Sequence, residues 1–199
     1  TQTTIGEAGC TIVGLSAILS ELTGTEISAD FLAHSDIFSD SAPDEIEWEK
    51  LCSLCSQITT YTFDDIRIIT RDFTQNFEFS VERTSKKDGT TTEENIREAI
   101  NNAESSKTLT GVIIEVEYTS KTDSKGNKKT HWTSAVGPVV DMDGKSYVKI
   151  KSTSIYDKKA NIMQGTARYT VGWKVVNKSV YVPLENIVSV VTVSHSKDR

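Results

Sequence analysis

Cys10 directly follows Gly9 and opens a run in which apolar residues recur at three- and four-residue intervals up to Leu22. This spacing predicts a helix that stops before Gly24. At the N-terminus of a helix, the dipole and the free backbone N–H groups stabilise a thiolate, and the same N–H groups can bind an oxyanion. Cys10 is therefore a candidate nucleophile. Its alternative role is that of a small buried residue, which is commoner for a cysteine at a helix start.

His131 is the candidate general base. It opens a predicted strand, His131–Val140, directly after the polar hairpin loop Ser120–Thr130. A strand end that faces a cleft can hold a base rigidly while the base reaches a nucleophile. The alternative is a hydrogen-bonded or exposed hairpin histidine. His34, after a short helix, and His195, in the polar tail, are weaker candidates.

The remaining chemistry-bearing residues give no comparable signal. With three cysteines no complete disulfide framework is possible, and Cys52 and Cys55 lie at helical spacing that favours buried thiols over a redox CxxC or half of a zinc site. The acidic residues between Asp36 and Glu45 do not match a calcium-binding loop, and no pair of carboxylates is singled out for glycoside hydrolysis. No phosphate-binding glycine loop is present. We therefore expect no cofactor and no metal.

The composition of the 199-residue chain is that of an ordinary globular domain, with 37% hydrophobic and 25% charged residues. A net charge of −6 argues against a nucleic-acid partner. No run approaches the ~20 apolar residues of a membrane span. The segment Thr1–Thr4 has neither a Met nor a signal-peptide pattern, which indicates a removed leader or an excised piece.

Helical periodicity comes first in the chain and strand patterns follow, so we expect an α+β fold. It forms one domain over 1–199, with a helical part to about residue 58 and a mainly β part to about residue 193, followed by a frayed tail. The helical part adds Ser28–His34, capped by Ser28, and Asp44–Gln57. The β part contains a helix opened by a capping box at Thr91–Glu94, and a turn at Asp141–Gly144. The apolar residues that this helix should turn inward are Ile96, Ala99, Ile100 and Ala103. Its predicted strands are Asn76–Arg83, Thr110–Tyr118, His131–Val140, Lys145–Lys151, Ala167–Val176, Ser179–Val182 and Ile187–Val193.

The run Gly9-Cys10-Thr-Ile-Val-Gly-Leu-Ser-Ala-Ile-Leu-Ser resembles the Gly-Cys helix of papain-like peptidases of the bacteriocin-processing type, which also occur in phage lysins and bacterial wall hydrolases. The stretch Ile27–Gln57 is similar to that group's next two helices. The run His131-Trp-Thr-Ser-Ala-Val-Gly137, with the turn and strand after it, resembles the family's histidine strand. The resemblance covers about residues 5–155 and implies a papain-like α+β fold.

The same resemblance implies cysteine-dependent cleavage of peptide or amide bonds, with Cys10 as nucleophile and His131 as the base that also protonates the leaving amine. Two departures stand out. Where the family has an orienting Asn or Asp, this chain has Ser152, and Asp157 would reach the imidazole only if the chain bends back. Where the family has an oxyanion-binding Gln, position 4 is Thr, so Gln2 would serve only with a bulge.

Among the relatives that this resemblance suggests, endolysins and wall hydrolases cut peptidoglycan, which is the substrate we expect, outside the cytoplasm at the bacterial cell wall. A secreted protein-cleaving cysteine protease fits the same residues. The alternative from another class is a non-catalytic papain-like binding module, which the missing Asn or Asp favours.

Overall fold

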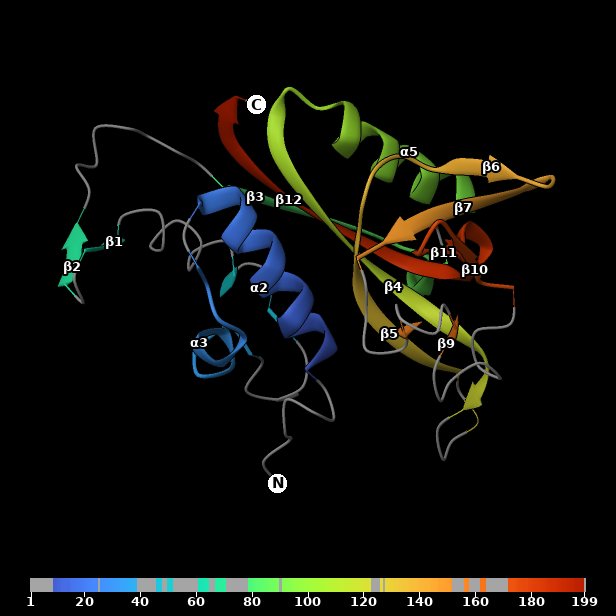
Figure 1. The fold of residues 1–199 in the computed structure, drawn as a ribbon, viewed down its shortest axis with the longest axis horizontal. Helices are drawn as coiled ribbons and strands as arrows, with labels where there is room; N and C mark the ends of the chain where they lie inside the picture. The colour runs from blue at the N-terminus through green and yellow to red at the C-terminus, as the bar shows by residue number, and fades with distance from the viewer. Residues whose placement is uncertain are drawn as a thin grey trace. The chain divides into compact units, whose positions relative to one another are not determined.

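The structure is a computed structural model in which helices are combined with antiparallel sheet, which confirms the α+β class (Figure 1). It describes the residues 9–24, 26–38, 46–47, 50–51, 61–64, 67–70, 79–89, 91–122, 126, 128–151, 156–157, 162–163 and 172–198. Among these residues, no helix is both long enough and apolar enough to cross a membrane.

The chain divides into two compact units. The first contains 1–82, 106–111 and 192–199, and the second contains 83–105 and 112–191. The strands β3 (Phe79–Ser85), β4 (Thr108–Thr122) and β12 (Ile187–Asp198) contribute residues to both. That residues 1–199 form a single domain stays a prediction.

Helix α2 (Cys10–Thr23) of the first unit confirms the helix predicted from the apolar spacing. Its buried side chains are those of the predicted stripe, Ile12, Leu15, Ile18, Leu19 and Leu22. The helix ends at Gly24, whose φ of 67° is easily adopted by glycine and whose N–H donates to the Ser20 carbonyl over 3.0 Å.

Helix α3 (Ala29–Ala33) is also confirmed, because the Ser28 side chain accepts the Phe31 N–H at 3.0 Å as an N-cap. The two helices are joined through Ile27: its N–H donates to the Ser20 hydroxyl (2.8 Å), and its carbonyl accepts from Ser16 (2.5 Å). Two serines on α2 thus satisfy the backbone polar groups of the residue that leads into α3.

The helix predicted from Asp44 begins later than expected. Ile46 forms an isolated antiparallel bridge with Phe38, and the Glu47 N–H donates to the Ile37 carbonyl over 2.8 Å. The first helical bond described here runs from the Leu51 N–H to the Glu47 carbonyl, at 3.0 Å. Backbone pairing with the nearby residues Ile37 and Phe38 therefore overrides the helical spacing at this start. The remainder of the predicted helix lies outside the described residues, apart from Lys50 and Leu51.

The principal sheet has the strand order β10-β11-β7-β5-β4-β12-β3, with β6 paired to β7. Its remaining strands are β3 (Phe79–Ser85), β5 (Lys128–Ala135), β6 (Val140–Met142), β7 (Lys145–Ile150), β10 (Lys174–Val176) and β11 (Ser179–Pro183). Two separate hairpins are formed by β1 (Tyr61–Asp64) with β2 (Arg67–Thr70), and by β8 (Tyr156–Asp157) with β9 (Ile162–Met163). Two short 3-10 helices are η1 (Lys86–Asp88) and η2 (Leu184–Asn186).

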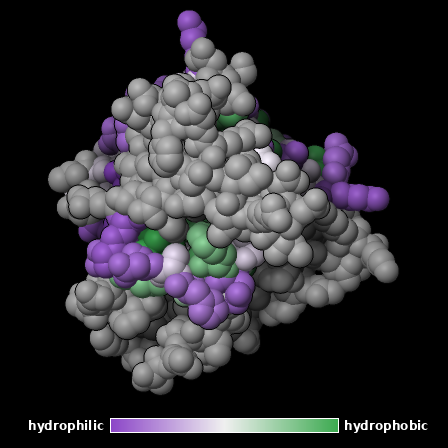
Figure 2. Space-filling model, turned by 90° about the vertical axis from the view of Figure 1, so that its left-hand side faces the viewer, coloured by the Kyte–Doolittle hydropathy of each residue, from purple (hydrophilic) through white to green (hydrophobic). Residues whose placement is uncertain are grey.

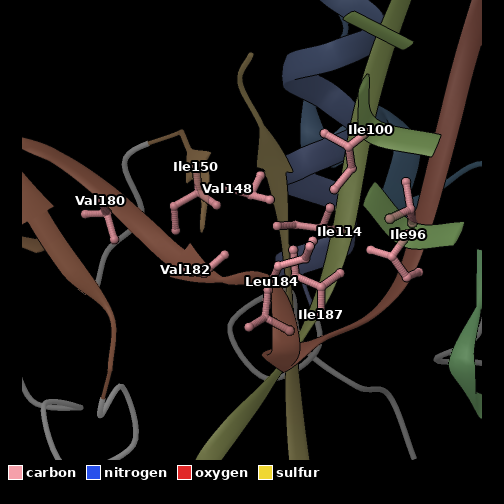
Figure 3. Packing of buried hydrophobic residues seen from close by; sticks show 11 residues of the cluster. Ile96, Ile100, Ile114, Val148, Ile150, Val180, Val182, Leu184 and Ile187 are labelled. Atoms are coloured by element: carbon pink, nitrogen blue, oxygen red, sulfur yellow. The ribbon is translucent and has the colours of Figure 1, made fainter. Parts of the chain in front are cut away.

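Helix α5 (Glu93–Ser105) packs its apolar side on one face of this sheet. Figure 3 shows the resulting core of the second unit, in which helix and strand side chains point toward one another. The cluster comprises Ile96, Ile100, Ile114, Val116, Val148, Ile150, Val180, Val182, Leu184, Ile187 and Val190. Of the four residues predicted to face inward, Ile96, Ile100 and Ala103 are buried, and Ala99 is partly buried against the cluster.

Several boundaries in the β part differ from the sequence prediction. Pairing of β4 with β5 continues to Thr122 and Lys128, so the hairpin loop is shorter than Ser120–Thr130. The predicted strand His131–Val140 is split, because β5 ends at Ala135 and β6 starts at Val140, with Gly137 at φ 78° between them. The tail expected to fray from Ser194 is strand up to Asp198. Backbone pairing extends these strands beyond their apolar runs.

Candidate active site

Cys10 is the first residue of α2, and its free thiol belongs to a half-buried residue. The first backbone bond of the helix runs from the Val13 N–H to the Gly9 carbonyl, at 2.9 Å. The N–H groups of the three residues between them, Cys10 included, therefore have no acceptor within the helix. No acidic residue lies in the first turn of α2. This helix end can stabilise a thiolate and an oxyanion.

One large apolar side chain is exposed near this helix end. Val13 lies one turn after Cys10 and is 54% exposed, the largest exposure among the large hydrophobic residues described. Figure 2 shows one face of the molecule, on which the described side chains are mainly hydrophilic, with a small hydrophobic group among them.

His131 lies on β5 in the second unit, opposite Val116 of β4, and shares that residue's face of the sheet. Its ring stacks on Tyr118, with centroids 6.0 Å apart and planes at 25°. Tyr118 also stacks on Trp173, at 6.3 Å and 14°. We call these three side chains the aromatic row. His131 is the fourth residue of β5, so it does not open the strand as predicted, because the hairpin pairing extends further toward the turn.

The aromatic row fixes the imidazole and also limits its access. The Nε2 atom of His131 is shielded from solvent. Trp173 Nε1 is buried too and has no hydrogen-bond partner among the described residues. Stacking on Tyr118 restrains the imidazole, which suits a general base. A shielded Nε2 must, however, be reached by the group whose proton it takes.

The other predicted site residues are only partly described. Gln2, Ser152, Cys52 and Cys55 lie outside the described residues. Asp157 pairs with Ile162 in the β8–β9 hairpin. Cys10 belongs to the first unit and His131 to the second, so each is described in its own surroundings and their pairing stays a prediction.

A buried polar group that sequence reasoning missed lies elsewhere in the second unit. Glu115 is 2% exposed and forms an ion pair with Lys87. The signal available in the sequence was a pair of carboxylates, Glu117 and Glu115, inside the otherwise apolar strand run Gly111–Tyr118, and the structure buries Glu115. Its partners come from distant elements, so the sequence could not identify them.

Ionisable groups with shifted pKa values lie elsewhere in the second unit. The Ser146 hydroxyl, followed by Arg97, lowers the pKa of Asp141. A hydrogen bond and charge attraction from Lys174 lower the pKa of Asp143. Partial burial lowers the pKa of Lys86 against the attraction of nearby glutamates. Among the described residues, no three His, Cys, Asp or Glu side chains gather where they could hold a metal ion.

Comparison of the chain with known protein families and with curated proteins finds no match.

Proposed function

We propose that this protein is a papain-like cysteine hydrolase that cleaves peptide or amide bonds, with Cys10 as the nucleophile. The observation that supports the proposal is the position of Cys10: this half-buried residue with a free thiol is the first residue of a 14-residue helix. The N–H groups of Cys10, Thr11 and Ile12 come before the first helical hydrogen bond, which Val13 donates, and so have no acceptor within the helix. Nucleophile and oxyanion donors would thus come from one helix end.

In the proposed reaction, the Cys10 thiolate attacks the substrate carbonyl carbon and forms a tetrahedral oxyanion. The helix N–H groups stabilise that negative charge. His131, which has taken its proton from the Cys10 thiol, gives that proton to the leaving amine, which departs as a thioester forms. His131 then takes a proton from the water that attacks the thioester, and the acid product leaves as the Cys10 thiolate is released. Because Nε2 of His131 is shielded, this role requires the surroundings of the aromatic row to admit the thiol.

The proposed substrate is peptidoglycan, at its stem peptides or at the amide bond that joins them to sugar. This choice rests on the resemblance of the Cys10 and His131 segments to lysin and wall-hydrolase peptidases. Gln2 is the proposed additional oxyanion donor, and Ser152 or Asp157 the proposed residue that orients the imidazole.

A non-catalytic papain-like binding module is the second candidate. It is favoured by the aromatic row, in which the half-buried His131 stacks on Tyr118 with its Nε2 shielded from solvent. In this case Cys10 would be a structural thiol at a helix start, and the protein would bind its target without cleaving it.

The test combines thiol reactivity with hydrolysis. At neutral pH, brief treatment with iodoacetamide followed by peptide mass spectrometry should label Cys10 before Cys52 and Cys55. Bacterial cell walls incubated with the wild type should lose turbidity, and Cys10→Ala should abolish that loss, whereas the matched variant Cys52→Ala should retain it. His131→Asn should abolish hydrolysis while wall binding in a pull-down persists.

Equal and slow labelling of the three thiols, together with wall binding that causes no turbidity loss, would overturn the hydrolase and favour the binding module. Rapid labelling of Cys10 without turbidity loss would contradict the substrate. In that case a panel of unfolded proteins and peptides should reveal Cys10-dependent cleavage.

A further inference from the structure

The carboxylate of Glu115 lies at the centre of a hydrogen-bonded group that joins four elements of the second unit. Its Oε1 atom is 2.5 Å from Lys87 Nζ of η1. Its Oε2 atom accepts the Ser189 hydroxyl of β12 over 3.0 Å. Ser189 is in turn 2.7 Å from the Ser85 hydroxyl of β3. We call this group, Ser85, Lys87, Glu115 and Ser189, the Glu115 network.

The donors of the network all point toward the carboxylate. The backbone N–H of Lys87 donates to the Ser85 hydroxyl at 3.2 Å. Because Ser189 gives its proton to Glu115, its own oxygen is left to accept the proton of Ser85. The Val188 carbonyl, 3.5 Å from Ser85, is a longer alternative acceptor. Such a chain is strongest when its final acceptor is an ionised carboxylate.

The network closes at the edge of the sheet. β3 is the last strand in the described order, next to β12, and Ser85 is its last residue. The Lys87 side chain starts two residues later and reaches back to Glu115 on β4. Lys87 therefore makes two connections at the end of β3. Its backbone N–H binds Ser85 of that strand, and its side chain binds Glu115 of β4, which lies on the other side of β12.

We infer that the Glu115 network is a clasp that holds the end of β3 on the sheet, and that the clasp depends on the charge of Lys87. Glu115 is 2% exposed, and a buried carboxylate without a charged partner is unfavourable. Lys87 is 53% exposed, so its charge is open to modification from solution. Neutralising it would loosen β3 and uncover the polar backbone edge of β12.

Hydrogen–deuterium exchange of the full chain tests the clasp. Glu115→Gln should accelerate exchange at the amides of Arg83–Lys87 about tenfold or more, while α5 keeps its wild-type rates. Lys87→Met should act in the same direction, and Lys87→Arg, which keeps the charge, should remain close to wild type. The matched control is Lys145→Met. It removes an exposed ion pair in which Lys145 Nζ lies 3.1 Å from Glu185 Oε1.

Unchanged exchange at Arg83–Lys87 in Glu115→Gln, or equal effects of Lys87→Met and Lys145→Met, would overturn the clasp. Acceleration spread evenly over the second unit would do so as well, because it would show a general loss of stability. If Glu115→Gln does not fold, the comparison of Lys87→Met with Lys87→Arg decides, since both leave the buried carboxylate in place.

Discussion

A single side chain acquires its chemistry here from the backbone and the charges around it. Cys10 owes its candidate role to the unpaired N–H groups of one helix turn, a property that its own segment contains. His131 is different, since its aromatic neighbours Tyr118 and Trp173 come from other strands and segments. Glu115 resembles His131 in this respect, because Lys87 and Ser189 are far from it in the chain.

Asp143 offers a residue-scale test of electrostatics. Asp143, with a φ of 52°, lies in the two-residue turn between β6 and β7. Its Oδ2 atom is 2.5 Å from Lys174 Nζ. The hydrogen bond and charge of Lys174 hold the pKa of Asp143 below its ordinary 3.8. This pair therefore stabilises the fold above the unfolded-state pKa of the aspartate, and the contribution is lost as pH falls through the lower folded-state value.

Lys174→Met should accordingly raise the pKa of Asp143 toward its ordinary value, measured by NMR titration of the side-chain carboxyl carbon. Lys145→Met, which removes a lysine paired with Glu185 instead, serves as the control and should leave that titration unchanged. A curve for Asp143 that does not move in Lys174→Met would refute the assigned cause.

Gly111 tests the packing of α2 at the scale of one atom. A Cβ added there would lie 2.1 Å from Cγ2 of Ile18, a branched atom that cannot move without a change of χ1. Gly111→Ala should destabilise the protein by about 1–3 kcal/mol, measured by urea unfolding. The cost should shrink when the same change is made in an Ile18→Ala background, and equal costs in both backgrounds would contradict the contact.

At the scale of elements, helix ends followed local chemistry more closely than strand ends did. Gly24 ends α2 and Ser28 caps α3 as predicted. The capping box of α5 is displaced by one residue from Thr91–Glu94. The Thr92 hydroxyl accepts the Asn95 N–H at 3.3 Å, and Asn95 Oδ1 accepts the Thr92 N–H at 2.9 Å. A short amide thus replaces the glutamate that the motif usually carries.

Thr92→Ala should therefore destabilise the protein by about 1 kcal/mol, because the first turn of α5 loses its cap. The matched change Thr91→Ala, at the neighbouring threonine, should have a much smaller effect. Both are measured as shifts in the midpoint of thermal unfolding. Equal shifts, or a larger one for Thr91→Ala, would show that the cap is wrongly assigned.

At the scale of the molecule, stability depends on how completely the apolar faces of each unit are covered. In the second unit, Val148 lies in the cluster between α5 and the sheet and is fully buried. Val176, at the end of the edge strand β10, is 38% exposed. The same residue type therefore occupies two different environments.

Val148→Ala should lower the free energy of unfolding by about 2 kcal/mol, since a buried side chain loses its contacts and leaves a cavity. Val176→Ala removes the same atoms from a partly solvated site and should cost well under half as much. Chemical denaturation of both variants provides the measurement. A similar cost at the two positions would be inconsistent with the described core.

The sequence by itself determined the features whose causes lie within about one helix turn. The span of α2, its glycine stop, the cap of α3, the inward residues of α5 and the turn at Asp143 and Gly144 are of this kind. Each depends on dihedral preferences or on hydrogen bonds between near neighbours. The α+β class followed from the order of these local patterns.

Only the tertiary structure decided which strands extend, where β5 breaks and which partners surround His131 and Glu115. The clearest case is the hydrogen bond from Ser189 to Glu115, which joins residues 74 positions apart. Such contacts are selected by the burial of whole faces and by the need to satisfy buried polar groups, and both are properties of the folded chain. The spacing of residues along a short segment carries no information about either the burial of whole faces or the partners of buried polar groups.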